Sequence, residues 1–424
     1  IEALRVFEDV LAPACISVDH PRFLSFVPAA PTEASILFDL VVGASSVYAG
    51  SWLEGAGAVH AENEALRWIA DLAGLPESAG GVFVSGGTAG NLSALIAARW
   101  RWRHRAEGRH DRTRGLMIAS AGAHSSIVQA ARAMDADVVA VPADGRGRMV
   151  GGALRAVVDA LDELDRERLF AVVATSGTTN VGVIDDLAGT AAVAADLDTW
   201  FHVDGAYGGA ALTAPSVRHL FDGIERADSF IVDPHKWLYA PLEAGCVLVR
   251  HAEAHRQTFS LTPEYLVHES RGLAAGNLWF SDLGLQLSRQ FRALKVWMSI
   301  KEHGLERFGR MMARNVEQAK YFGKLIEHEP AMELLAPISL DIVCFRFNPG
   351  GMANTALNAL NKEILIQLQE RGIAAPSYTT LHGQYCLRVA IANHRSQKDD
   401  FEILAREVVR LGRELAVQFH RPAI

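Results

Sequence analysis

The sequence predicts an α/β fold with a mostly parallel central sheet flanked by helices, followed by a small α+β C-terminal domain. Two observations support this prediction. From about residue 80 to residue 250, short β-branched runs alternate with stretches of helix length, and beyond that region the order of strands and helices changes. Strands joined by helix-length crossovers form a parallel sheet that is covered on both faces. Because such sheets bind ligands at the carboxyl ends of their strands, we expect the functional residues there.

The expected elements follow one another in a regular order along the chain. The pairs of strand and helix are 82–84 with 90–105, 116–119 with 125–134 and 170–174 with 188–195, and the further strands are 200–203, 231–232 and 246–249. A helical stretch over about 285–327 leads to the smaller domain, which is expected from strand 342–347, helix 353–371, strand 385–391 and helix 398–417.

The length of 424 residues exceeds what one hydrophobic core accommodates, so we expect at least two packed units with a cleft between them. We divide the chain into an N-terminal helical segment (1–60), a large domain that carries the candidate site (61–305) and a small C-terminal domain (306–424).

The net charge of −8 argues against a general nucleic-acid or anionic-membrane binder, because both tasks need a positive field. Residues 99–105 interleave tryptophan with arginine and histidine, which can suit a stacking surface for single strands. The end of an amphipathic helix with a solvated basic face explains that run better. Every apolar stretch is far shorter than the roughly 20 residues that span a bilayer.

The four cysteines lie far apart and form neither a disulfide framework nor a metal-ligand spacing. They are Cys15, Cys246, Cys344 and Cys386. We therefore expect reduced thiols, a cytoplasmic location and no metal site. Because the chain begins with Ile1 rather than Met, a preceding targeting segment stays open.

Residues 229–237 place a lysine directly after an apolar run. Lys236 lies between His235 and Trp237, where burial lowers the pKa of an amine as imine formation requires. An isolated lysine in such a place is more often a surface residue whose stem packs on apolar neighbours. On its own, this motif is weak.

Residues 202–209 form a strand that runs into a turn of small residues and presents Asp204 at the strand end. Pyridoxal phosphate uses a carboxylate to keep its ring nitrogen protonated, so that the ring can accept electrons. A helix cap or turn former is the structural alternative for this carboxylate.

Residues 85–92 form a glycine-rich turn between an expected strand and a long helix. Gly87 lets the backbone approach an anion, and the amides of the helix N-terminus, with the Thr88 hydroxyl, can bind a phosphate. The turn lacks the Lys-Ser/Thr of a Walker A loop and is not a full dinucleotide fingerprint. A tight strand-helix turn is the structural alternative.

Two further motifs follow expected strands. His124 precedes a helix and can stack on a cofactor ring, although a lone histidine is more often structural. Residues 175–180 offer hydroxyls that can hold a phenolic or phosphate oxygen, or can simply form a polar turn. Together, the five motifs supply an amine, an acid, a phosphate site, an imidazole and polar clamps at the strand ends of one sheet.

These motifs resemble the group II pyridoxal-phosphate-dependent decarboxylases, which include the aromatic amino acid, histidine and glutamate decarboxylases. The resemblance runs from residues 20–23 through 229–246 to 387–391 and so covers almost the whole chain. It implies the fold type I architecture of the PLP-dependent transferases, pyridoxal 5'-phosphate as cofactor, and a homodimer with its active sites at the subunit interface, where the N-terminal segment makes contact.

By the same resemblance, Lys236 is the Schiff-base lysine, Asp204 pairs with the pyridine nitrogen and His124 stacks on the ring. The positions implied to lie against the cofactor or its phosphate are Gly87, Thr88, Thr179, Ala206 and His235, with Ser288 reaching a phosphate in the partner chain. Many relatives have Asn where this chain has Asp233. A carboxylate near a phosphate is repelled unless it turns away or is paired.

Residues 263–268 resemble the mobile catalytic loop of aromatic amino acid decarboxylases. In that loop a tyrosine, here Tyr265, protonates the carbanion left after CO2 departs, while the closed loop excludes water. Relatives without this tyrosine can turn to oxidative deamination, so Tyr265 favours simple amine formation. An ordinary exposed loop tyrosine is the structural alternative.

We therefore expect a lyase that decarboxylates an L-amino acid to the corresponding amine and CO2. The competing functions are an aldehyde synthase, a carbon–carbon lyase, an aminotransferase and a non-catalytic PLP-binding relative. The intact set of Lys236, Asp204, His124 and Tyr265 argues against the last of these.

Two segments, 26–29 and 52–54, resemble the region that forms the pocket for the substrate side chain in this family. Phe26 and Trp52 suit an aromatic or large apolar group, whereas Glu54 suits a cationic one. Core packing explains the two aromatic residues equally well. The absence of a recognisable Arg or Lys clamp disfavours an acidic substrate.

Overall fold

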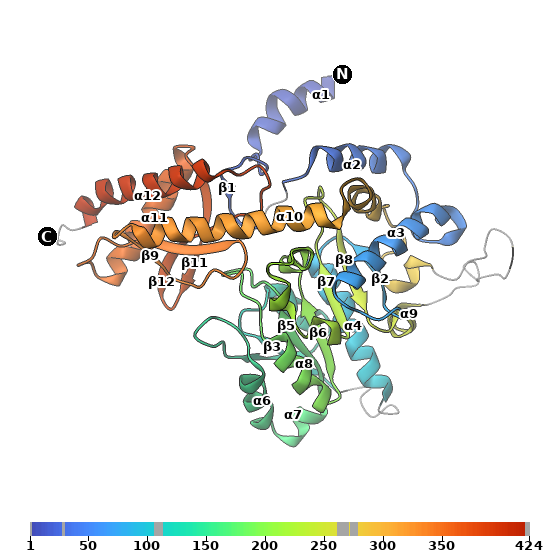
Figure 1. Ribbon diagram of the computed structural model, residues 1–424. Helices are drawn as coiled ribbons and strands as arrows, with labels where there is room; N and C mark the ends of the chain where they lie inside the picture. The colour runs from blue at the N-terminus through green and yellow to red at the C-terminus, as the bar shows by residue number, and fades with distance from the viewer. Residues whose placement is uncertain (1, 28–29, 106–112, 261–270, 272–278, 420–424) are drawn as a thin grey trace.

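The computed structural model describes residues 2–27, 30–105, 113–260, 271 and 279–419. In this part of the chain two sheets form, one of seven strands and one of five. The long helix α10 (Ala293–His328) runs between them, and Figure 1 shows it passing from above the larger sheet to the smaller domain. Helix α10 bends at Gly304, which lies next to the expected domain boundary at residue 305.

The larger sheet has the strand order β2-β8-β7-β6-β5-β3-β4. The strands are β2 (Gly80–Val84), β3 (Leu116–Ser120), β4 (Asp137–Val141), β5 (Leu169–Thr175), β6 (Trp200–Asp204), β7 (Ser229–Val232) and β8 (Gly245–Val249). The five strands from β7 to β4 are parallel, and β8 is antiparallel to both of its neighbours. Every residue of β5 is buried, as expected for a strand covered on both faces. The prediction of a mostly parallel sheet is confirmed.

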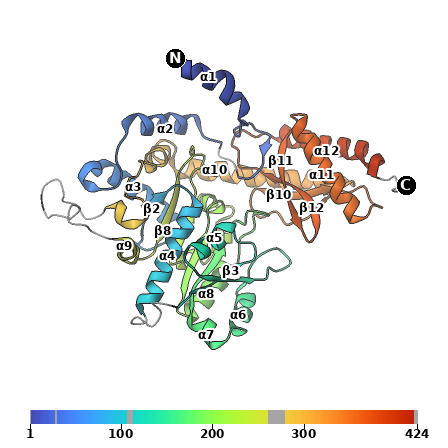
Figure 2. The same cartoon turned by 180° about the vertical axis from the view of Figure 1, so that it is seen from behind.

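Helices cover both faces of this sheet. Helix α8 (Leu187–Asp196) lies in front of the strands in Figure 1, and α4 (Gly87–Arg105) and α5 (Ser125–Ala133) lie in front in Figure 2. The remaining helices around this sheet are α3 (Trp52–Leu72), α6 (Gly151–Asp159), α7 (Glu163–Glu167) and α9 (Ala252–Phe259). Because helices cover both faces of the sheet, the carboxyl ends of the parallel strands are the part that remains open to a ligand.

The smaller sheet has the order β1-β11-β12-β10-β9 and is antiparallel except for the pair β1 and β11. Its strands are β1 (Phe23–Leu24), β9 (Met332–Leu334), β10 (Ile342–Phe347), β11 (Ala375–Leu381) and β12 (Gln384–Ala390), and helices α11 (Asn354–Glu370) and α12 (Lys398–Phe419) pack against them. Residues His382 and Gly383 both have positive φ, which is the backbone that a two-residue hairpin requires.

The expected helical stretch over 285–327 is wrong at its start. The helix begins at Ala293, while Gln290 forms a β-bridge with Tyr48 and Arg289 enters a buried ion pair with Glu62. These tertiary contacts hold the preceding residues out of the helix. Strand β11 was not expected, because Pro376 and several hydroxyl residues break the apolar pattern that identifies strands.

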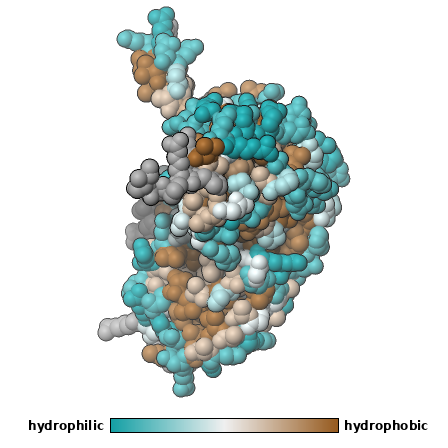
Figure 3. All heavy atoms as spheres, turned by 90° about the vertical axis from the view of Figure 1, so that its left-hand side faces the viewer, coloured by the Kyte–Doolittle hydropathy of each residue, from teal (hydrophilic) through white to brown (hydrophobic). Residues whose placement is uncertain are grey.

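The N-terminal segment is only partly packed against the body of the protein. It contains α1 (Glu2–Val6), a π-helical turn (Phe7–Leu11) and α2 (Glu33–Ser45). Helix α2 packs against α10, whereas none of the residues of α1 or of the turn is buried. Figures 1 and 3 show α1 projecting from the rest of the chain. No helix in the described ranges is both long enough and apolar enough to cross a membrane.

Candidate active site

A cavity of about 370 Å³ opens at the carboxyl ends of the parallel strands. Its walls come from all five motifs of the sequence. The lining residues include Gly87, Thr88, His124, Thr179, Asp204, Ala206, His235 and Lys236. The structure therefore brings together eight of the candidate site residues, from segments as far apart in the chain as α4 and the turn after β7.

Lys236 forms an ion pair inside this cavity. Its Nζ lies 3.0 Å from Oδ2 of Asp233, which is almost fully buried. Asp233 is thus paired, which is the condition under which a carboxylate is tolerated near a bound anion. Burial lowers the pKa of the neighbouring His235, whose Nδ1 accepts a hydrogen bond from the Ala244 amide (3.0 Å). His235 is therefore neutral at pH 7, with Nδ1 as an acceptor and Nε2 as a donor.

The glycine-rich turn is packed closely against two other motifs. A Cβ atom at Gly87 would lie 3.0 Å from Cβ of Ala206 and 3.0 Å from Oδ2 of Asp233, so a side chain does not fit there. This close approach brings the N-terminus of α4 to the cavity wall beside Thr88. The free amides of a helix N-terminus carry a partial positive charge, which, with the Lys236 ammonium, favours an anionic group.

Asp204 presents a buried carboxylate at the end of β6. Its Oδ2 accepts a hydrogen bond from Nδ2 of Asn91 (2.9 Å), and its Oδ1 accepts one from the Ala206 amide (3.1 Å). Both oxygens thus have a donor, as a buried carboxylate needs. His124 caps α5: its Nδ1 accepts from the Ser126 amide (3.2 Å) and lies 2.9 Å from the Ser126 hydroxyl.

Some polar groups around the cavity lack partners. Within the described part of the chain, Oγ1 of Thr175 and Oδ1 of Asp233 are buried and make no hydrogen bond. Both residues line the cavity. Unsatisfied buried groups at a cavity wall are typical of a site that binds a polar ligand.

The remaining predicted residues do not line the cavity that the described residues form. Phe26 and Trp52 are 70% and 40% exposed, and Ser288 and Glu54 are also exposed. Their placement within one chain neither brings them to the cavity nor tests a role across a subunit interface. Tyr265 lies outside the described residues.

Sequence reasoning did not assign a role to Asn91, although it falls within the glycine-rich motif. Asn91 lines the cavity and bonds Asp204 from 113 residues away in the chain. The available signal was its position three residues after Thr88, which places both residues on one helix face. Ser126 and Tyr207 also line the cavity and were not predicted.

The donors and acceptors of this cavity fit pyridoxal phosphate. A helix N-terminus and a lysine suit a phosphate and an aldehyde, a buried carboxylate suits a protonated ring nitrogen, and a flat imidazole suits a ring face. Each of these groups is present, and the space that Gly87 leaves beside Ala206 and Asp233 would be filled by any larger residue.

Known proteins share this chain's sequence and fold. Residues 3–348 match the pyridoxal-dependent decarboxylase conserved domain. An aromatic-L-amino-acid decarboxylase of Bacillus atrophaeus is 32% identical over 406 residues, which cover 95% of this chain and 83% of the relative.

Several solved structures are similar over 98% of this chain. TDC of Oryza sativa, solved with PLP and tryptamine, has 26% identity, a TM-score of 0.91 and 88% of its own length covered. The glutamate decarboxylase domain of a diaminobutyrate-pyruvate transaminase and L-2,4-diaminobutyrate decarboxylase from Vibrio parahaemolyticus has 28% identity, a TM-score of 0.85 and 85% covered.

Proposed function

Because the chain belongs to the pyridoxal-dependent decarboxylase family, and is therefore a PLP-dependent carboxy-lyase of amino acids, we propose that its substrate is an L-amino acid with an aromatic or large apolar side chain. The joint placement of Lys236, Asp204 and His124 in one cavity supports the PLP chemistry on which the proposal rests. The aromatic preference is supported by the Bacillus atrophaeus relative, an aromatic-L-amino-acid decarboxylase, and by the tryptamine in the Oryza sativa structure.

Bound pyridoxal phosphate supplies a ring that accepts the electrons left on Cα when CO2 departs. We propose that Lys236 anchors it covalently, and that Asp204 holds the proton of the ring nitrogen. The amides at the N-terminus of α4, with Thr88 and His235, would bind the phosphate. His124 would stack on the ring, and Thr179 and Ala206 would complete the walls.

Tyr265 is proposed as the acid that protonates Cα. A phenol within reach of Cα can donate one proton to that carbon. Tyr265→Phe should therefore lower amine formation by roughly 100-fold or more, within the range of general acid catalysis. Cofactor binding should stay unchanged, as measured by absorbance titration. Wild-type turnover in this variant would remove Tyr265 from the mechanism.

A homodimer is proposed from the exposed apolar side chains of the N-terminal segment. Leu37, Leu40 and Val41 on α2 are 61%, 66% and 45% exposed, and the neighbouring α1 and π-helical turn expose Leu4, Phe7, Val10 and Leu11. An apolar surface of this kind indicates a protein contact rather than a surface exposed to solvent. A second copy of the chain is the proposed partner. Phe26, Trp52 and Ser288 would then reach the active site of that copy across the interface.

The dimer is tested by light scattering on Leu37→Glu with Leu40→Glu. We expect the wild type at twice the chain mass, and the variant at one chain mass with decarboxylation lost. Val417→Glu is the matched control, because Val417 is similarly exposed (67%) on α12. A monomeric wild type with full activity would contradict the proposal.

We propose a cytoplasmic location as well, supported by the four free cysteines.

The substrate is tested by incubating the PLP-loaded enzyme with each of the twenty amino acids, dopa and diaminobutyrate. Released CO2 and amine are measured, with keto acid and aldehyde as competing products. We expect the largest kcat/KM for an aromatic amino acid. Selective release from diaminobutyrate would instead favour a cationic side chain, for which Glu54 is the candidate partner, and would overturn the aromatic proposal.

A further inference from the structure

We infer that Asn91 is a positioning residue that holds Asp204 and His124 together, and that His202 fixes the orientation of the Asn91 amide. This inference rests on the proposed roles of Asp204 and His124. His202 does not line the cavity and acts on it through Asn91. The roles of Asn91 and His202 follow from the fold and were not predicted from the sequence.

The inference begins with the hydrogen bonds of Asn91. Its Nδ2 donates both to Oδ2 of Asp204 (2.9 Å) and to Oγ of Ser126 (2.9 Å). Its Oδ1 lies 2.8 Å from Nε2 of His202. One amide thus makes three contacts with two elements, β6 twice and α5 once, and both N–H donors of Nδ2 are used.

The direction of each hydrogen bond follows from the groups that Asn91 contacts, the Asp204 carboxylate and the His202 ring. An ionised carboxylate only accepts, so Nδ2 rather than Oδ1 of Asn91 must face Asp204. Oδ1 then faces His202 and needs a donor, which is Nε2–H. Without that donor, the amide could turn its oxygen toward the Asp204 carboxylate and repel it.

The other end of the network agrees with this direction. The indole Nε1 of Trp200 can only donate, and it lies 2.7 Å from Oγ of Ser229. Ser229 Oγ also lies 2.7 Å from Nδ1 of His202, so its hydroxyl proton can be given to that nitrogen. Burial lowers the pKa of His202 to about 4, which keeps the ring neutral at pH 7. With Nδ1 accepting from Ser229 and Nε2 facing Oδ1 of Asn91, we infer that the single proton is on Nε2.

The second branch reaches His124 through Ser126. Because Ser126 Oγ accepts from Asn91, its own proton is available to Nδ1 of His124, at 2.9 Å. The Ser126 backbone amide also donates to Nδ1 (3.2 Å). A neutral His124 therefore carries its proton on Nε2. Asn91 sets the carboxylate on one side and supports the tautomer of the imidazole on another.

A double-mutant cycle on cofactor affinity tests the inference. In the cycle, the dissociation constant of PLP from the apo-protein is measured for the wild type, Asn91→Leu, Asp204→Asn and the double variant. We expect Asn91→Leu to weaken binding about 10- to 100-fold, the range for a hydrogen bond to a charged group. In the Asp204→Asn background the same change should cost less than about threefold, because coupled residues are not additive.

Further variants separate the branches. Ser126→Ala should leave PLP affinity within about twofold and lower kcat/KM for the amino acid, because only the His124 branch is cut. His202→Phe should weaken PLP binding in the same direction as Asn91→Leu, and His202→Gln, which keeps a donor, should restore part of it. Should Asn91→Leu not fold, Asn91→Ser replaces it in the cycle.

Asn361 provides a matched control. It is also fully buried, but its bonds go to the backbone of Phe347 and Leu357 in the small domain. Asn361→Leu should lower stability and leave PLP affinity within about twofold. Additive effects of Asn91→Leu and Asp204→Asn would overturn the inference alone. Unchanged affinity in Asp204→Asn by itself would instead overturn the proposed role of Asp204, and the inference with it.

Discussion

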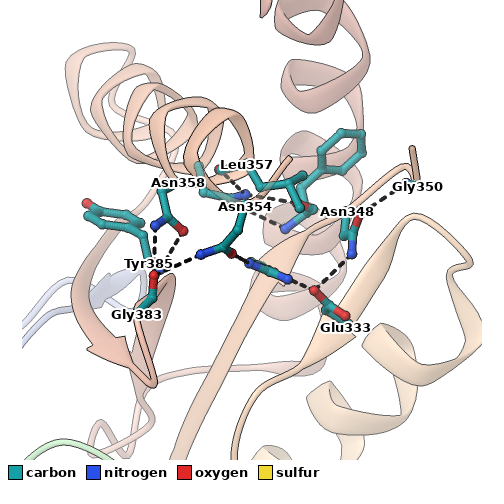
Figure 4. Close-up of polar contacts among 11 residues, drawn as sticks. Glu333, Asn348, Gly350, Asn354, Leu357, Asn358, Gly383 and Tyr385 are labelled. Atoms are coloured by element: carbon teal, nitrogen blue, oxygen red, sulfur yellow. Dashed lines mark hydrogen bonds and ion pairs between the residues drawn. The ribbon is translucent and has the colours of Figure 1, made fainter. Parts of the chain in front are cut away.

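Two networks of polar side chains in this protein are similar in composition but connect to different kinds of groups. In the large domain, Asn91, His202, Ser229 and Ser126 connect to Asp204 and His124, which line the cavity. In the small domain, Arg346 pairs with Glu333 and donates to Asn354 (2.8 Å), and Asn354 donates to the carbonyl of Gly383 (3.0 Å), as Figure 4 shows for the labelled residues.

The two networks differ in the groups at which they end. The small-domain network ends on backbone groups of turns: Asn358 holds Gly383 and Tyr385, and Asn348 holds Gly350. These bonds fix the hairpin of β11 and β12 to the start of α11. The large-domain network ends on side chains that face a cavity. The first arrangement stabilises a fold, and the second orients groups for a ligand.

The largest expected effect comes from the open end of the large-domain network. Asp204→Asn should lower amine formation by roughly 100- to 1000-fold, because the charge that stabilises the reacting state is lost. The thermal midpoint should fall modestly, because the NH2 group of the new amide faces the donor of either Asn91 or Ala206. Turnover at saturating PLP and calorimetry measure the two quantities. If the variant kept wild-type turnover, the networks would not differ in function.

The next largest effect is expected in the small domain. Asn361→Ala should destabilise the protein by about 2–3 kcal/mol, because the N–H and C=O of Phe347 are left buried without partners. Urea unfolding measures the loss. Turnover per folded molecule should stay at the wild-type level, and a parallel loss of turnover would show that the two networks are not separate.

A pH-dependent effect is expected where the two domains meet. Asp341, at the start of β10, accepts a hydrogen bond from Tyr207, and burial raises its pKa to about 7 from 3.8. Because the folded pKa is the higher one, this carboxyl stabilises the fold most below pH 3.8, and that stability is lost as the pH rises to 7.

Asp341→Asn removes this titration. The variant should gain stability over the wild type progressively between pH 4 and 7, by up to roughly 4 kcal/mol above pH 7. Urea unfolding at pH 4.5, 6 and 8 measures the gain. A constant difference across these pH values would contradict the assignment.

The smallest effect is expected at the exposed edge of the small-domain network. Asn354→Ala should cost less than about 1 kcal/mol, because its contacts with Arg346 and Gly383 lie partly in water. Differential scanning calorimetry measures the change. A loss as large as that of Asn361→Ala would show that exposure does not separate the two positions.

The sequence predicted the strand-end site better than the networks behind it. The site motifs are local: Asp204 and Lys236 each follow a strand, and the parallel sheet brings strand ends together. The role of Asn91 could not be predicted in the same way, since it depends on side chains from α4, α5, β6 and β7 meeting in space.

Other failures have their own physical causes. Strand β11 contains Pro376, which cannot donate a hydrogen bond to a sheet and so weakens a strand prediction, and its pairing with β12 decides its structure. Phe26, Trp52 and Ser288 are exposed on the described surface, and their proposed roles stay predictions.

The central claim is that this cavity binds pyridoxal phosphate covalently at Lys236. Borohydride reduction of the PLP-loaded enzyme, followed by peptide mass spectrometry, tests it directly. We predict one modified peptide, which contains Lys236, and none in Lys236→Ala. Lys295 is an internal control, because it too is paired with a carboxylate, at 2.8 Å from Asp39, and it is buried, whereas Lys236 is half-buried. Modification at Lys295 or another lysine, with turnover retained in Lys236→Ala, would contradict the claim.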